Sequence, residues 1–486
     1  MSTHRFLRSL FLFLFLVLTF ATLSTATADS SVNVLLITSD DLGIQTGCYG
    51  DTAARTPHLD ALAGRGCLFE NAYVAQASCS PSRSAMFTGL YPHSNGQYGL
   101  LNANVGFQLH PRAQSQTIPL LLKQDGYRTG ILGKLHVGDE KQFPFDVRVR
   151  VDTRDVKAAA AEAGKFFRSS DGPFFFMANY ADPHVQGRSP RPPREAFPTQ
   201  YKGVPETPLK IGEVCSFPFQ RLDVPEQIAR TTQYYNAVTR LDAGIGLLLD
   251  ELKSAGHADD TLILFVGDHG PPFFRGKTSC YEGGVHVPLL AVWPNVTKAG
   301  QRSSALVSTV DILPTILDAV GHQPQASVNV QGKSLRDAVT HDDFREYLAT
   351  EFHYHGGKPF FPRRTIRDRQ FKLIRNLRAG KAEPINSIDG DAALRLAREH
   401  ADSVPAEVLQ AFERAADPPE FELFDLESDP WEFHNLAEDS RFQAHLLRLQ
   451  EALRKWQAQT NDPLLTQEDY ETVAEFESRQ PDPPRR

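Results

Sequence analysis

Residues 32–41 read Val-Asn-Val-Leu-Leu-Ile-Thr-Ser-Asp-Asp, a short apolar run that ends in two acids. Such a run is typical of a strand buried on both faces of a sheet. Similar runs recur at 129–132, 173–178, 261–266 and 287–293, with helical patterns between them at 118–124, 227–254 and 311–320. The alternation predicts an α/β fold with a large, mostly parallel central sheet flanked by helices, in which ligands bind beyond the carboxyl ends of the strands.

The pattern changes after about residue 345. Strand-like stretches at 364–375 and 421–426 are joined by a Pro-rich, charged connection, and a helical pattern covers 441–460. We therefore expect a large domain over residues 29–345 and a smaller α+β domain with an antiparallel sheet over 346–475. The last residues, 476–486, are rich in Pro and charge and are expected to be disordered.

The N-terminus has the features of a targeting segment. Arg5 and Arg8 precede an apolar run from Leu10 to Phe20, and Ala26-Thr27-Ala28 forms a small-residue cleavage pattern. The run is shorter than the about 20 residues that span a bilayer, so a cleaved signal peptide at 1–28 is favoured over an anchor. The prediction is an exported protein, periplasmic or secreted, or lysosomal in a eukaryote, with no stable membrane span after cleavage.

Charge and cysteine count narrow the possible functions. The net charge of −8 argues against nonspecific binding of nucleic acid. Five cysteines are few for a disulfide scaffold, and their number is odd. One cysteine is therefore a candidate for special chemistry, although a buried thiol without a reaction is the alternative.

Residues 79–89 read Cys-Ser-Pro-Ser-Arg-Ser-Ala-Met-Phe-Thr-Gly. Ser80 can cap a helix and Pro81 can occupy its first turn, so Cys79 is expected at a helix N-terminus, where backbone N–H groups and the dipole favour an anion. From these residues alone the prediction is a thiol of low pKa.

The segment resembles the signature of the type I sulfatases, which is Cys-x-Pro-Ser-Arg followed by Thr-Gly. The resemblance implies an alkaline-phosphatase-like sulfatase fold and oxidation of Cys79 to formylglycine by a formylglycine-generating or sulfatase-maturating enzyme. It also implies that the aldehyde hydrate attacks the sulfur to give a sulfated enzyme, and that Arg83 holds the hydrate. An aldehyde hydrate has a second hydroxyl that can expel sulfate, which Ser or Cys would lack.

Further family positions are spread over the large domain. Two acids follow the first strand and an Asp-His pair follows a later one, and the resemblance implies that they bind one Ca²⁺ per chain through Asp40, Asp41, Asp268 and His269. The family more often has Asn at the place of His269, which is a departure here.

Three segments supply the expected sulfate side of the site. Lys134 and His136 have a strand-like spacing that points both to one side. By resemblance Lys134 binds a sulfate oxygen, His136 contacts the formylglycine, and His184 and Lys277 stand at the family's remaining sulfate-binding positions. From the charges that develop in the reaction, we expect His184 or Lys277 to protonate the leaving group and His136 to remove a proton from the sulfated hydrate. His353 and His355, in an aromatic and basic stretch, are candidates for sugar binding, with an ordinary junction loop as the alternative.

Within the family the chain resembles the sulfamidases most, through segments 78–83, 95–100, 130–138, 144–146 and 182–184. This resemblance implies that the substrate is N-sulfated glucosamine in heparan sulfate or heparin. Lys277 where a sulfamidase has Arg, and Tyr281-Glu282-Gly283-Gly284, leave an O-sulfatase on a sulfated glycan as the alternative. A metal-dependent phosphohydrolase and a noncatalytic glycan-binding protein are less favoured, because Cys79 replaces Ser or Thr and no catalytic side chain is missing.

Overall fold

A computed structural model describes residues 32–101, 107–169, 172–186, 197, 207–323, 325, 328–356 and 360–466. The expected signal peptide and the C-terminal tail lie outside these residues. No described helix is long and apolar enough to cross a membrane.

The larger of two sheets has eight strands in the order β4-β3-β5-β1-β6-β7-β2-β8. All neighbouring pairs are parallel except those that β7 makes with β6 and β2. The strands are β1 (Asn33–Ser39), β2 (Cys67–Tyr73), β3 (Arg128–Gly133), β4 (Val147–Val149), β5 (Phe174–Tyr180), β6 (Thr261–Gly267), β7 (Leu289–Val292) and β8 (Gln301–Ser308). The mostly parallel α/β sheet expected from the sequence is confirmed.

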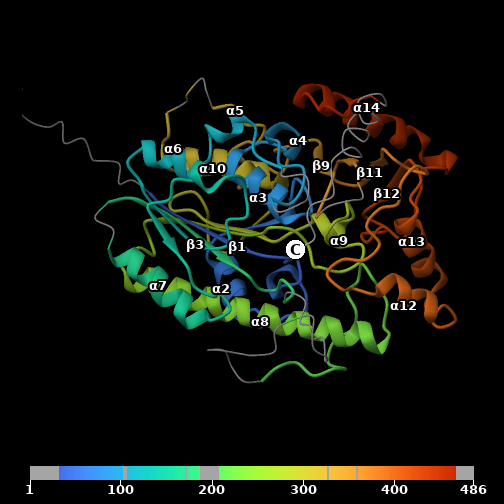
Figure 1. Cartoon of the computed structure of the whole chain (residues 1–486), viewed down its shortest axis with the longest axis horizontal. Coiled ribbons are helices and arrows are strands. Elements are labelled where there is room, and N and C mark those ends of the chain that lie inside the picture. The colour runs from blue at the N-terminus through green and yellow to red at the C-terminus, as the bar shows by residue number, and fades with distance from the viewer. Residues whose placement is uncertain are drawn as a thin grey trace, which may run out of the picture.

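Helices cover both faces of this sheet (Figure 1). One layer contains α3 (Cys79–Thr88), α4 (Pro92–Asn95), α5 (Pro111–Gln114), α6 (Ile118–Gln124) and α10 (Ile312–Ala319), and the other α2 (Pro57–Arg65), α7 (Val156–Arg168) and α8 (Pro225–Ser254). The short helix α11 (Leu335–Ala338) packs into the core of the first layer. Because successive residues of a strand face opposite sides, Val34 and Leu36 of β1 pack into the first layer, and Leu35 and Ile37 into the second. The short helix α9 (Glu282–Val285) follows β6.

The second sheet is antiparallel, in the order β12-β11-β10-β9. Its elements are β9 (Leu348–Phe352), β10 (Arg363–Arg367), β11 (Phe371–Asn376), α12 (Ala393–Glu399), α13 (Ala406–Ala416), β12 (Phe421–Asp425) and α14 (Gln443–Thr460). The single strand-like stretch 364–375 is a hairpin, and the connection before β12 carries two helices that its Pro-rich, charged character did not indicate. In Figure 1 this sheet and its helices lie beside the larger sheet, next to α9.

Candidate active site

Acids from two strands meet at one edge of the larger sheet. Strands β1 and β6 are parallel neighbours that pair Ser39 with Gly267, so the residues after them emerge together. The backbone N–H of Asp41 donates to Asp268 Oδ1 at 3.0 Å, and His269 Nε2 lies 3.4 Å from Asp41 Oδ1. Asp40, Asp41, Asp268 and His269 are all buried. The structure thus brings together the four residues expected to bind a metal.

Cys79 is the first residue of α3 and faces this acidic cluster. Its Sγ lies 3.6 Å from Asp40 Oδ1 and 3.3 Å from His269 Nε2. The helix N-terminus was predicted correctly, but the assignment of Ser80 as its cap was wrong. Ser78 occupies the N-cap position, and the Ser80 hydroxyl instead accepts a hydrogen bond from the backbone N–H of Leu101.

Two lysines offset the negative charge around Cys79. Lys134 Nζ lies 2.7 Å from Asp40 Oδ2, and Lys277 Nζ lies 3.0 Å from Asp41 Oδ1. Burial by itself raises the pKa of the Cys79 thiol, but Lys134 and Lys277 lower it to about 7. The two lysines therefore favour a negative charge at the position of the Cys79 side chain.

Lys134 reaches the site from a turn and not from a strand, because β3 ends at Gly133. Gly133 has φ +81, and a Cβ there would lie 2.1 Å from the carbonyl oxygen of Asn179. Only glycine fits this turn. The strand-like spacing of Lys134 and His136 was therefore the wrong reason for their shared direction, since His136 itself has φ +55.

Arg83 joins the ends of several strands. Its Nε donates to Asp268 Oδ2 at 3.0 Å, and its Nη1 donates to Asn179 Oδ1 at 2.9 Å and to the carbonyl oxygen of Lys134 at 3.2 Å. Its Nη2 is buried and has no hydrogen-bond partner among the described residues. Arg83 thus holds β5, β6 and the turn after β3 together, with the N–H groups of Nη2 still available.

The two candidate proton-transfer histidines have opposite electrostatic surroundings. Burial and Lys134 lower the pKa of His136 to about 3, which keeps its ring neutral. Burial also lowers the pKa of His184, but Asp41 and Asp40 outweigh burial and raise it. His184 Nε2 lies 3.9 Å from Asp41 Oδ2, on the side of Lys277.

The donor set fits a hard divalent cation. Asp40, Asp41, Cys79 and His269 offer ligand atoms within 4.8 Å of one another. Asp41 Oδ1 is buried, and among the described residues it has charge contacts with Lys277 and His269 but no hydrogen bond. His269 Nδ1 lies 3.0 Å from the carbonyl oxygen of Gly270, which leaves Nε2 to face the cluster. Carboxylate oxygens are the ligands that Ca²⁺ and Mg²⁺ prefer. Asp268 accepts hydrogen bonds from the Asp41 backbone and from Arg83, and its Oδ1 lies 3.6 Å from His269 Nε2, beside the other expected ligands.

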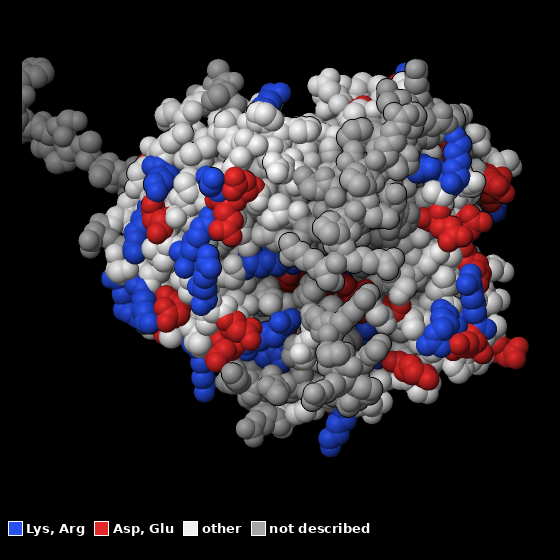
Figure 2. Space-filling view, viewed as in Figure 1, with Lys and Arg blue, Asp and Glu red and all other residues white. Residues whose placement is uncertain are grey.

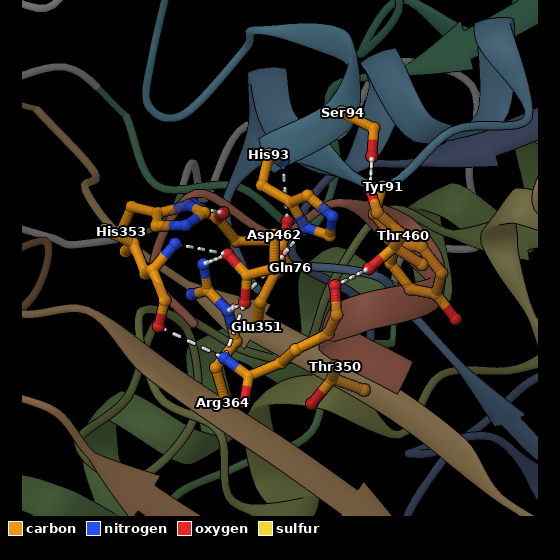
Figure 3. A network of polar contacts seen from close by, with 12 residues as sticks. Gln76, Tyr91, His93, Ser94, Thr350, Glu351, His353, Arg364, Thr460 and Asp462 are labelled. Carbon is orange, nitrogen blue, oxygen red and sulfur yellow. Dashed lines mark hydrogen bonds and ion pairs between the residues drawn. The ribbon is translucent and has the colours of Figure 1, made fainter. Parts of the chain in front are cut away.

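The second sheet supports the segment that leads to Cys79. The backbone N–H of Glu351, on β9, donates to the carbonyl oxygen of Ala75 at 2.8 Å, and Ser78 Oγ lies 3.0 Å from His355 Nδ1. His353 is fully buried with its Nδ1 3.2 Å from Gln76 Oε1, within the network of Figure 3. The structure therefore brings His355 to the rim of the site and places His353 behind it.

The face seen in Figure 2 carries basic and acidic side chains side by side, with no broad patch of one sign in its described part. Near its centre, acidic and basic side chains also appear in a recess beside residues drawn in grey.

Comparison with known proteins agrees with this geometry. The sequence matches the sulfatase family over residues 32–322. The chain belongs to the sulfatase family. A second match, to the C-terminal region of N-sulphoglucosamine sulphohydrolase, covers residues 267–391 of this sulfatase.

Two relatives span most of its length. The chain is 34% identical to human N-sulphoglucosamine sulphohydrolase over 462 residues, 89% of this chain and 91% of the relative. It is 27% identical to an ulvan-active sulfatase of Formosa agariphila over 87% of this chain and 74% of the relative.

Solved structures share the fold of this sulfatase. A protein solved in complex with its substrate D-glucosamine-2-N,6-O-disulfate is 20% identical and has a TM-score of 0.64, over 89% of this chain and 99% of that one. The phosphonate monoester hydrolase of Agrobacterium radiobacter is also 20% identical, with a TM-score of 0.62 over 88% of this chain and 96% of that one. Fold alone therefore does not separate sulfate from phosphonate chemistry.

Sequence reasoning missed several residues of the site. Asn179, at the end of β5, accepts from Arg83 and from Thr38. Asp182 holds the loop before His184 through a bidentate pair with Arg240 at 2.5 and 2.8 Å. Asp389 lies 2.8 Å from Lys277 Nζ. The position of Asn179 after an apolar run was a usable signal, whereas nothing in the sequence relates Asp389 to Lys277.

Proposed function

We propose that this sulfatase hydrolyses the N-sulfate of glucosamine in fragments of heparan sulfate or heparin. The observation that carries the proposal is the position of Cys79 at a helix N-terminus, between a buried acidic cluster and the cations Lys134 and Lys277. The substrate is inferred from the likeness to human N-sulphoglucosamine sulphohydrolase over 91% of that protein's length.

In this proposal the site also needs a bound Ca²⁺ ion and a formylglycine at position 79. Asp40, Asp41, Asp268 and His269 would hold Ca²⁺, and Cys79 would be converted to formylglycine by a separate maturating enzyme. Together they would supply a nucleophilic oxygen on a hydrated aldehyde and a positive charge next to it. The available donor at Arg83 Nη2 supports its expected contact with that oxygen.

Binding of the sulfate group and transfer of protons would be carried out by lysine and histidine side chains of the site. Lys134 and Lys277 would hold the sulfate oxygens and stabilise charge that develops during transfer. His184, whose Nε2 lies 3.9 Å from Asp41 Oδ2, would donate the proton that the leaving group needs, a contribution of about 10²–10⁴-fold. His136 is neutral, as a group that removes a proton must be.

The same proposal places the protein outside the cytosol. The segment Leu10–Phe20 with Ala26-Thr27-Ala28 supports export and removal of residues 1–28. The mature enzyme would then meet sulfated carbohydrate in a periplasm, an extracellular space or a lysosome.

The test compares sulfate release from N-sulfoglucosamine and from glucosamine 6-O-sulfate. The protein is first checked by mass spectrometry for the aldehyde at Cys79. We expect release from the N-sulfated sugar. Release from the O-sulfated sugar alone would assign an O-sulfatase, an outcome that Lys277 in place of Arg would help to explain, and release from neither would refute this substrate class.

A further inference from the structure

The loop between β11 and α12, which belongs to the region of the antiparallel sheet, carries Asp389, and the carboxylate of Asp389 lies in the candidate site. Asp389 Oδ2 lies 2.8 Å from Lys277 Nζ, which also lies 3.0 Å from Asp41 Oδ1. Asp41, His184 and Asp389 offer atoms within 4.8 Å of one another. The Lys277 side chain is 1% exposed and that of Asp389 is 22% exposed, so Asp389 forms the outer wall of the site next to His184.

The loop that carries Asp389 is anchored on the larger domain. The carboxylate of Asp391 accepts a hydrogen bond from the backbone N–H of Phe274 at 2.6 Å, and Arg230 Nη2 donates to the carbonyl oxygen of Asp389 at 3.1 Å. Asp389 and Gly390 both have positive φ, +51 and +80. A left-handed conformation at a residue other than glycine is unfavourable and persists where neighbours hold it. The direction of the Asp389 carboxylate is therefore fixed by the fold.

These three residues do not form a second metal site. The ammonium group of Lys277 contacts both carboxylates and so occupies the place between Asp41 and Asp389 that a cation would take. Lys277 keeps its contact with Asp41 if the carboxylate of Asp389 is removed, which leaves the sulfate side of the site with both of its lysines.

The negative charge of Asp389 repels a sulfate group, so Asp389 does not help to bind the sulfate. We therefore consider how Asp389 could act on the leaving group. When an S–N bond breaks, the electron pair stays on nitrogen, which takes up protons and leaves as an ammonium group. Hydrolysis of R–NH–SO₃⁻ by water thus gives R–NH₃⁺ and SO₄²⁻. Hydrolysis of R–O–SO₃⁻ gives a neutral alcohol, SO₄²⁻ and a released proton. The two leaving groups differ by one positive charge.

We propose that Asp389 is a specificity-determining residue that favours a nitrogen leaving group, because its carboxylate accepts hydrogen bonds from the amine that forms beside His184. This inference rests on the proposed function, since it explains how the site would prefer a sulfamate to a sulfate ester. Asp389 would contact the leaving group, which differs between sulfamates and sulfate esters. Lys134 and Lys277 would contact the sulfate group, which both kinds of substrate share.

The test compares Asp389→Asn with the unaltered protein on N-sulfoglucosamine and on 4-nitrophenyl sulfate, whose leaving group gains no positive charge. Glu383→Gln, at an exposed acid of the same loop, is the matched control. In Asp389→Asn we expect the ratio of kcat/KM for N-sulfoglucosamine to kcat/KM for the aryl sulfate to fall at least about tenfold, and in Glu383→Gln to stay the same. All proteins are matched for aldehyde content.

A binding measurement keeps the inference testable without turnover of the sugar. Glucosamine, the ammonium product, is expected to inhibit aryl sulfate hydrolysis more strongly than neutral glucose, and Asp389→Asn is expected to remove this difference. An equal loss on both substrates, or equal inhibition by the two sugars in the unaltered protein, would overturn the inference. An unaltered protein that cleaves the aryl sulfate but not N-sulfoglucosamine would instead refute the proposed function, and the inference with it.

Discussion

The buried network of Figure 3 predicts a specific dependence of stability on pH. Glu351 Oε2 lies 2.6 Å from His93 Nδ1 and 3.7 Å from Arg364 Nε, and all three side chains are fully buried. Burial by itself raises the pKa of Glu351, but His93 and Arg364 outweigh it and lower the pKa from 4.5 to about 2. One pKa unit corresponds to about 1.4 kcal/mol, so the ionised carboxylate contributes on the order of 3 kcal/mol to the free energy of unfolding.

A depressed carboxyl pKa stabilises the protein above the unfolded-state pKa and loses that effect as pH falls toward the folded-state pKa. Glu351→Gln removes the charge and is expected to lower the free energy of unfolding by about 3 kcal/mol at pH 7. The difference from the unaltered protein should shrink by about 1.4 kcal/mol at pH 3.5, because the unfolded state then binds the proton.

The assay is urea unfolding followed by tryptophan fluorescence at pH 7, 5 and 3.5. Glu346→Gln, at an exposed acid two residues before β9, is the matched control and should change stability by less than about 0.5 kcal/mol. A difference between Glu351→Gln and the unaltered protein that stays constant from pH 7 to 3.5 would refute the assigned pKa shift. A variant as stable as the control at pH 7 would refute the contribution of the charge.

Two further predictions concern the site. Gly133→Ala should lower the free energy of unfolding by more than about 2 kcal/mol, because its Cβ would lie 2.1 Å from a carbonyl oxygen. Gly126→Ala is the control, since Gly126 has φ +83 but open space around it, and it should lower the free energy of unfolding by only about 1 kcal/mol. Similar thermal midpoints of the two variants would contradict the clash. Removal of divalent cations with a chelator should lower the thermal midpoint and stop sulfate release. Addition of Ca²⁺ at 100 times its Kd should restore about 2.7 kcal/mol of the free energy of unfolding. An unchanged thermal midpoint would argue against a metal at Asp40 and Asp41.

The parts of the fold that sequence predicted are those with long apolar runs. The runs at 32–38 and 261–266 became β1 and β6 within one residue, because strands buried on both faces leave no room for polar residues. Strand β2 was missed because Glu70 and Asn71 interrupt its apolar pattern on a partly exposed stretch. The hairpin between β10 and β11 was taken as one strand, since its turn depends on Asp368 accepting from the backbone N–H groups of Gln370 and Phe371.

Some residues of the site can also be predicted from local sequence patterns, whereas others join the site only through tertiary packing. Cys79, Asp40 and Asp268 stand in motifs or directly after strands, so a sequence pattern can indicate them. Asp389 contacts Lys277 although the two residues are 112 positions apart in the sequence. Such a contact depends on how the two sheets pack, and no periodicity along the chain encodes it.

The expected boundary near residue 345 therefore separates two sheets but not two functions. Strand β9 supports the residues before Cys79 through the hydrogen bond from Glu351 to Ala75, and the loop of Asp389 contacts the lysine expected to bind sulfate. Glu282, the first residue of α9 between β6 and β7, is buried with its carboxylate 2.9 Å from Lys372 Nζ of β11. Removal of the second sheet and its helices would take away this partner, and it would expose to water the apolar cluster in which Phe274 and Tyr281 pack against Phe412 and Phe424. Residues 29–345 alone would thus lack both the support of Cys79 and much of their own stability, so the active unit is the chain with both sheets.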